Sequence, residues 1–97
     1  MFVKIHKSYR TVVAVCDDEI IGKIFEEGIK QLDCRENFYK DRILNREELI
    51  KLLKMQALED ATFNIVGKNS VDAAIEAEIV REGNISKVQD IPFVLIF

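Results

Sequence analysis

The chain of 97 residues contains no tryptophan, one proline and two cysteines. Two cysteines do not form the disulfide framework that stabilises many small secreted domains. No apolar run approaches the roughly 20 residues that a membrane-spanning helix requires, so we expect no membrane association. Charge at Lys4 interrupts the first apolar residues too early for a signal peptide. These features predict a cytoplasmic protein.

An excess of basic residues is also missing. The chain has 14 Lys and Arg against 17 Asp and Glu, which gives a net charge of −3. Proteins dedicated to duplex DNA usually carry a basic excess, because neutralising phosphates supplies most of their non-specific affinity. A local basic patch remains compatible with this composition. With 48% hydrophobic and 32% charged residues, the chain has a globular composition, and its length predicts one domain over residues 1–97.

Four strands are predicted in the first third of the chain, over residues 2–6, 11–16, 20–26 and 29–34. The first alternates apolar and polar side chains, which is typical of a half-buried strand. The second is almost wholly apolar and β-branched, which indicates an interior strand. Because the connections are short, we expect the four strands to form an antiparallel meander.

The following residues change to a helical period. Asn45 and Glu48 resemble a capping box, and leucines recur at helical spacing to about residue 58. A second helix is predicted from Asn69 or Ser70 to a C-terminal cap at Gly83.

The segment between the two helices, residues 61–67, fits either a short strand or an extension of the first helix, and we favour an extended segment. Strands are predicted over residues 85–89 and 93–97, broken by Pro92. Strands, then helices, then strands indicate an α+β fold. We expect a two-layer sandwich with a mainly antiparallel sheet, an N-terminal β-meander, two helices on one face, and C-terminal strands.

The densest group of possible metal ligands follows the second predicted strand. A thiolate and carboxylates together can bind a divalent metal, which makes a small metal-dependent protein or enzyme the alternative function. The chain has no Cys-x-x-Cys motif, however, and its only histidine, His6, is expected at the other end of the sheet. An acidic hairpin turn with small buried cysteines explains the same residues, and we expect no cofactor. The candidate metal ligands are Cys16, Asp17, Asp18, Asp33 and Cys34.

In a meander Cys16 and Cys34 lie at the same end of the sheet, two strand spacings apart. Their Cα atoms would be separated by about 9–10 Å. A disulfide needs a separation below about 7 Å, so the thiols are expected to be unbridged.

A basic segment lies at the opposite end of the predicted meander, and no acid interrupts residues 4–10. A tyrosine among cations suits stacking on RNA bases and contact with phosphates. A solvated hairpin tip explains the same pattern. The preferred function is a non-enzymatic binding or adaptor module, associated with RNA or a ribonucleoprotein. The residues that carry this hypothesis are Lys4, His6, Lys7, Tyr9 and Arg10.

Three further features are candidates for binding. The run from Asn64 through Gly67 and Lys68 to a helix start leaves backbone N–H groups that can bind an anion, although a turn and helix cap explain it more simply. Lys23 lies close to the acidic turn. Phe38 and the adjacent tyrosine either contact a partner or fill the edge of the core.

The terminal strand, residues 93–97, is apolar on both faces. At a sheet edge it would pair with a second copy and form a homo-oligomer. In the centre of the sheet it is core, which we favour.

Several short motifs match a known family in order and spacing: Cys16-Asp17, Ile21-Gly22-Lys23, Phe25-Glu26-Glu27-Gly28, Phe38-Tyr39, Asn64-Ile65-Val66-Gly67, Val71 and Ile91-Pro92. Over nearly its whole length the chain resembles a small archaeal family known only as domain of unknown function four hundred and twenty-four. The resemblance implies an archaeal cytoplasmic protein with a two-layer α/β sandwich, and it implies no reaction. The chain departs from the family pattern at Lys40, where glycine is usual, and at Phe93, where histidine is frequent.

Overall fold

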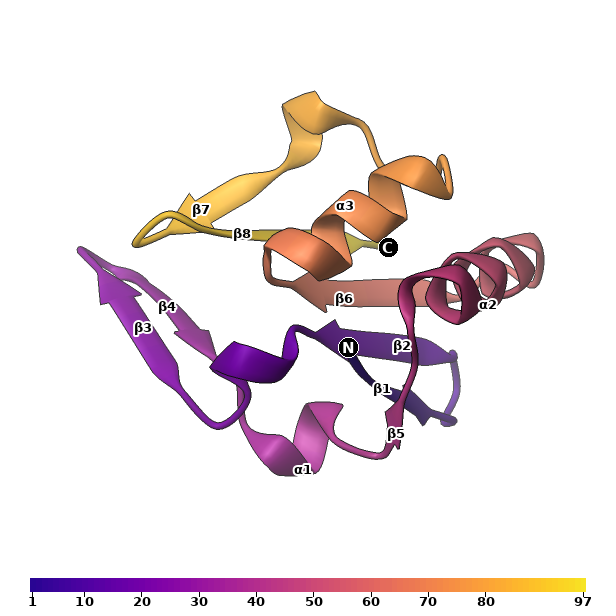
Figure 1. Cartoon of the computed structure of the whole chain (residues 1–97), viewed down its shortest axis with the longest axis horizontal. Helices are drawn as coiled ribbons and strands as arrows, with labels where there is room; N and C mark the ends of the chain where they lie inside the picture. Colours follow the sequence, from indigo (N-terminus) through magenta and orange to yellow (C-terminus); the bar gives the residue numbers. More distant parts are fainter.

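The computed structural model describes all 97 residues. The strands are β1 (Phe2–His6), β2 (Val12–Cys16), β3 (Ile24–Glu27), β4 (Lys30–Asp33), β5 (Arg42–Ile43), β6 (Thr62–Val66), β7 (Ser86–Val88) and β8 (Ile91–Ile96). The helices are α1 (Glu36–Tyr39), α2 (Arg46–Leu58) and α3 (Lys68–Glu76), with 3-10 turns at Asp18–Ile20 and Glu82–Asn84. Six strands form one sheet in the order β5-β1-β2-β6-β8-β7, and β3 and β4 form a separate hairpin (Figure 1). No helix is both long enough and apolar enough to cross a membrane.

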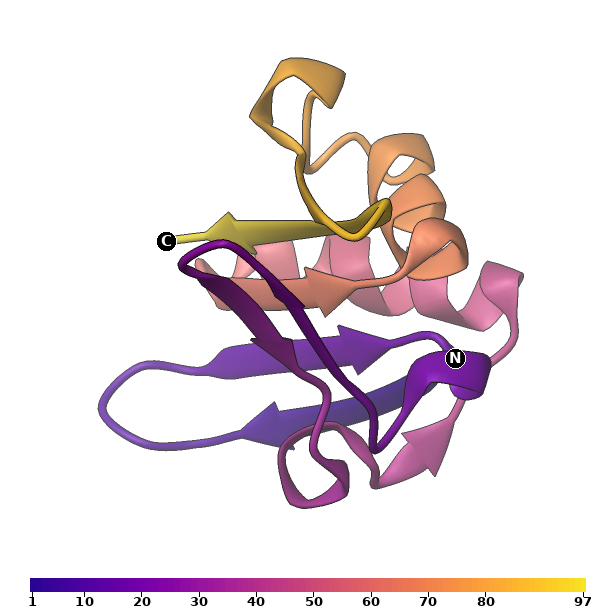
Figure 2. The ribbon, with the colours of Figure 1, turned by 90° about the vertical axis from the view of Figure 1, so that its left-hand side faces the viewer.

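The sheet separates two hydrophobic clusters. On one face α2 and α3 pack against apolar side chains such as Val13, Val15 and Ile65. On the other face Cys16 and Val66 pack against the β3–β4 hairpin and α1. Figure 2 shows α2 behind the sheet and the hairpin crossing in front of it. The predicted α+β fold, with two main helices on one face of a mostly antiparallel sheet, is confirmed.

The predicted antiparallel meander of four N-terminal strands is wrong, because β2 does not pair with β3. Instead β2 lies between β1 and β6, and its pairing with β6 is parallel. After Asp17 the chain enters a 3-10 turn, and Gly22 follows with a φ of +82°. Glycine adopts this backbone conformation without the steric cost of a side chain, so the chain can turn away from the sheet. Strand β3 therefore begins at Ile24 rather than residue 20 and pairs only with β4.

The segment between the helices is a strand, as the preferred interpretation predicted. Strand β6 lies in the centre of the sheet, where β2 and β8 flank it. The predicted capping box is also confirmed: the Asn45 side chain accepts from the Glu48 N–H at 2.9 Å, and Glu48 accepts from the Asn45 N–H at 3.0 Å.

Pro92 does not break the last strand, which was predicted to begin after it. It lies inside β8, opposite Lys87 of β7, and its carbonyl accepts from the Gly67 N–H at 2.8 Å. Proline has no N–H to return to the Gly67 carbonyl. That carbonyl accepts from the Val71 N–H at 2.9 Å instead, so the proline leaves no unpaired acceptor. Strand β8 lies between β6 and β7, as the core interpretation of the terminal strand expected.

Helix α3 ends at Glu76, well before the predicted cap at Gly83. Ala77 is the C-terminal cap, and Glu78 follows with a φ of 63° in the left-handed region. A residue in this conformation just after the cap ends a helix. Gly83 lies in the second 3-10 turn instead.

Candidate functional site

A row of four side chains crosses the sheet on the face opposite α2 and α3. Strand register places Lys4 of β1 beside Ala14 of β2, Ala14 beside Asn64 of β6, and Asn64 beside Leu95 of β8. Ala14 is fully buried, whereas Leu95 is 47% exposed. The covering elements therefore close the β2 part of this row and leave the β8 part open to solvent.

Two of the predicted binding residues fix α1 to β1. The Lys4 ammonium donates to the Asn37 carbonyl at 2.9 Å. The Nε2 atom of His6 lies 2.8 Å from the Phe38 carbonyl oxygen. Because a carbonyl oxygen only accepts, Nε2 must carry the hydrogen in this contact. The His6 ring also stacks on the Phe38 ring, with centroids 4.5 Å apart and an interplanar angle of 21°.

A cavity of about 350 Å³ lies where α1 meets β6. Its lining combines two aromatic rings with a carboxylate, a guanidinium and an amide: Asp33, Arg35, Phe38, Tyr39 and Asn64. The Tyr39 hydroxyl donates to Asn64 Oδ1 at 3.0 Å, and Arg35 Nη2 lies 3.1 Å from Asp33 Oδ2. Burial, the largest cause, raises the pKa of Tyr39 above its usual value, which keeps the hydroxyl protonated as a donor.

The two cysteines lie in the same buried cluster as Tyr39 and are free. The Cys16 thiol donates to the Asp17 carbonyl at 3.5 Å. The two thiols also influence one another, and chiefly for this reason the pKa of Cys16 is raised and that of Cys34 is lowered. Burial also raises the pKa of Cys16. The meander that set their expected separation does not exist, so their place in the same cluster comes from the packing of the hairpin on the sheet.

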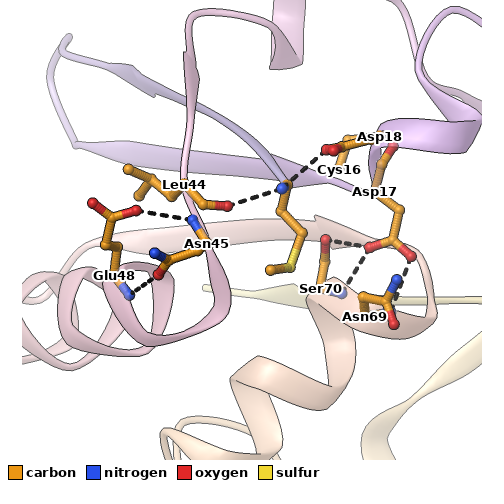
Figure 3. Close-up of polar contacts among 9 residues, drawn as sticks. Cys16, Asp17, Asp18, Leu44, Asn45, Glu48, Asn69 and Ser70 are labelled. Carbon is orange, nitrogen blue, oxygen red and sulfur yellow. Dashed lines mark hydrogen bonds and ion pairs between the residues drawn. The ribbon is translucent and has the colours of Figure 1, made fainter.

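Asp17 caps the N-terminus of α3 from the end of a different strand. Its Oδ1 accepts from the Ser70 N–H at 2.7 Å and from the Ser70 hydroxyl at 2.6 Å, and its Oδ2 accepts from the Asn69 N–H at 2.9 Å (Figure 3). An anion is favoured there because the first N–H groups of a helix have no partner within the helix. The N–H groups that the sequence offered as an anion site are thus bound by the protein's own carboxylate.

Gly67 is required for this contact. Its φ is +109°, and a Cβ atom placed on it would lie 2.3 Å from Asp17 Cγ. Parallel pairing puts Cys16 opposite Val66, so the next residues of the two strands meet at the same end of the sheet. No local signal in the sequence identifies this contact, because it depends on the pairing of two distant strands.

The five predicted metal ligands are divided among separate interactions. Asp17 caps α3, Asp18 pairs with the terminal ammonium at 2.9 Å, and Asp33 pairs with Arg35. No three His, Cys, Asp or Glu side chains are arranged to hold a metal ion. The metal site stays a prediction that the geometry of these residues does not favour.

Comparison with known proteins places the chain in a family. The family model described as "Protein of unknown function (DUF424)" matches residues 6–97. The chain belongs to the DUF424 family. No curated protein matches it. A crystal structure of an uncharacterized conserved protein from Methanopyrus kandleri is similar, with a TM-score of 0.88 and 21% identity over 98% of this chain and 88% of that one. This likeness shows the fold.

In this DUF424 chain the predicted binding residues form two groups at opposite ends of β2. Lys7, Tyr9 and Arg10 occupy the β1–β2 loop, next to His6, and Tyr9 is fully exposed. Gly67 and Lys68 lie at the other end, beside Asp17.

Lys23 and Asn64 belong to neither group. The Lys23 carbonyl accepts from the Cys34 N–H at 2.9 Å, which places this lysine beside the segment that leads into α1. Asn64 lines the cavity, whereas Arg35 was not identified from the sequence. An exposed arginine in a connection has no periodic or spacing signal that distinguishes it from any other surface residue.

Proposed function

We propose that this protein is a non-enzymatic module that binds single-stranded RNA through the β1–β2 loop and the adjoining open part of the sheet. The observation that carries the proposal is the loop itself. It presents Lys7, Tyr9 and Arg10 to solvent, and no acidic residue interrupts residues 4–10. An exposed aromatic ring between cations combines the two contacts that single-stranded nucleic acids need, base stacking and phosphate neutralisation.

The charges in the loop are available to a phosphate. Lys7 has no ion-pair partner, and Arg10 contacts only Asp60, at 3.4 Å. The Asp60 side chain is 92% exposed, and ion pairs in solvent contribute little to stability. Replacing this partner by a phosphate therefore costs the protein little. The net charge of −3 favours a short contact with one strand over the long basic surface of a duplex binder.

The open part of the sheet extends this surface. Figure 2 shows the β1–β2 loop and the C-terminal end of β8 at the same end of the sheet. Leu95 and Phe97 are exposed there, and Phe97 is 88% exposed. Exposed aromatic and apolar side chains on a sheet provide surfaces on which unpaired bases stack.

The groups that nucleophilic catalysis would require are engaged elsewhere. Cys16 and Cys34 are fully buried. His6 is stacked on Phe38 and contacts a backbone carbonyl. An activated cysteine needs a base within hydrogen-bond reach and access to substrate, so this arrangement supports binding rather than a Cys–His reaction.

The test is fluorescence anisotropy with a labelled oligouridine at low and high salt. We compare the wild-type protein with the double variant Lys7→Glu/Arg10→Glu. The control is Lys51→Glu/Lys54→Glu, which makes the same charge change at two exposed positions on α2.

We expect salt-sensitive binding by the wild type and the control. The loop variant should bind at least about tenfold more weakly. Its slope of log affinity against log salt should fall by about 1.4, because each phosphate contact on a single strand contributes about 0.7. The proposal is wrong if the wild type shows no salt-sensitive binding. It is also wrong if the control loses as much affinity as the loop variant, because net charge then explains the effect.

A further inference from the structure

We infer that the cavity between α1 and β6 binds one guanine base of the RNA strand, an inference that rests on the proposed function. The cavity has a volume of about 350 Å³. Pockets for small molecules start at about 300 Å³, so this one has room for a single base. Its lining residues differ from those of the β1–β2 loop, and they supply directional hydrogen bonds that the loop does not.

Some hydrogen-bonding groups of the cavity are already paired with one another. The donors and acceptors that are still free determine which ligand can bind. Tyr39 donates to Asn64 Oδ1, so the Asn64 amide has its Nδ2 hydrogens free to donate. Asp33 accepts from Arg35 through Oδ2. A carboxylate has about four acceptor positions, so Asp33 retains capacity for two further donors. The lining therefore offers free acceptor positions on Asp33 and free donor hydrogens on the Asn64 amide.

Guanine is the base that fits this pattern. Its Watson–Crick edge carries two adjacent donors, N1–H and the N2 amino group, next to one acceptor, O6. Asp33 can accept both donors, and Asn64 Nδ2 can donate to O6. Adenine and cytosine present one donor group next to a ring acceptor, which the Asp33 carboxylate would repel. Uracil presents a single donor between two acceptors, and the Asp33 carboxylate would repel those acceptors as well.

The walls of the cavity are held in place before a ligand arrives. Phe38 is fixed by the stacked His6 ring on one side and by Tyr39, whose centroid is 4.9 Å away at an interplanar angle of 82°. The Arg35 side chain is 61% exposed, so its planar guanidinium is accessible to stack on a base. Groups that are already ordered lose little conformational freedom on binding, and this favours a specific ligand.

The experiment is a titration of the ¹⁵N-labelled protein with guanosine, adenosine, cytidine or uridine 5′-monophosphate, followed by NMR. The side-chain resonances of Asn64 and Arg35 report on the cavity. The variant Asp33→Asn removes the paired acceptors, and Glu36→Gln is the control, because Glu36 is an exposed carboxylate on α1 that does not line the cavity. Dispersion of the amide spectrum checks that each variant is folded.

We expect saturable shifts of the Asn64 side-chain amide with the guanosine nucleotide, and at least about tenfold weaker binding of the other three. Asp33→Asn should lose this preference, and Glu36→Gln should keep it. Equal shifts with all four nucleotides, or an unchanged preference in Asp33→Asn, would overturn the inference. If labelled oligouridine binds the loop at low salt but no nucleotide shifts Asn64, the guanine site is wrong and the RNA function stands. If neither binds, both are wrong.

Discussion

The carboxylate of Asp17 should be one of the largest single contributors to the stability of this fold. It joins the end of β2 to the start of α3 and is 2% exposed. Its two oxygens accept three hydrogen bonds, at 2.6, 2.7 and 2.9 Å. The perturbation is Asp17→Ala, which removes both acceptors and leaves the donors of Ser70 and Asn69 where they are.

The magnitude follows from the burial of those donors. Loss of a helix N-terminal cap costs about 0.5–2 kcal/mol. Ser70 is fully buried, so its backbone N–H cannot reach water in the variant. An unpaired buried donor costs about 1–3 kcal/mol. The two costs overlap in part, and together they predict a loss of about 3 kcal/mol in the free energy of unfolding, against a typical total of about 5–15 kcal/mol.

The measurement is urea denaturation followed by circular dichroism. For a urea slope of about 1 kcal/mol/M, the midpoint of Asp17→Ala should fall by about 3 M. Asp17→Asn keeps the size of the side chain, but its NH₂ group faces a backbone N–H of α3 and cannot accept from it. This variant should therefore lower the free energy of unfolding by about 2 kcal/mol. The control Glu19→Gln removes a nearby exposed charge and should stay within about 0.5 kcal/mol of the wild type. A midpoint for Asp17→Ala equal to that of the control would refute the reasoning.

Two further predictions concern the same end of β6 and the cavity. Gly67→Ala should lower the free energy of unfolding by about 3 kcal/mol, because its Cβ would lie 2.3 Å from Asp17 Cγ at a φ of +109°. In the control Gly83→Ala the new Cβ meets no atom within 4 Å, so stability should change by less than about 1 kcal/mol. Equal urea midpoints for the two variants would contradict this prediction. The pKa of Tyr39 is raised in the folded state, so the unfolded chain loses this proton first and stability should fall as pH rises above the ordinary value of 10.0. Urea midpoints on either side of that pH should fall less in Tyr39→Phe than in the wild type, and equal falls would exclude this contribution.

Local features of the sequence identified most of the elements. The capping box of Asn45 and Glu48 works within one helical turn, and it formed where the pattern placed it. The β-branched run around Val13 became an interior strand, because such a run is stable only with both faces covered. Local propensity could not show that the chain leaves the sheet after Asp17, since short connections normally join neighbouring strands.

The candidate site was only partly predictable. Lys7, Tyr9 and Arg10 are adjacent in the sequence, so their shared exposure on one loop could be expected. The cavity brings together Asp33, the last residue of β4, and Arg35, which follows the hairpin, with Asn64, which lies in a central strand. No periodicity relates these segments, because their meeting depends on how the hairpin and α1 pack across the sheet.

The sequence by itself determined the types of most elements and the fold class, because side-chain period, capping and turn chemistry act over a few residues. Only the tertiary structure decided that β2 pairs with β6, that Asp17 caps α3 against Gly67, and that Tyr39 reaches Asn64. Each of these contacts joins distant segments. Their register is set by the joint burial of apolar faces across the whole sheet, which no short stretch of sequence contains.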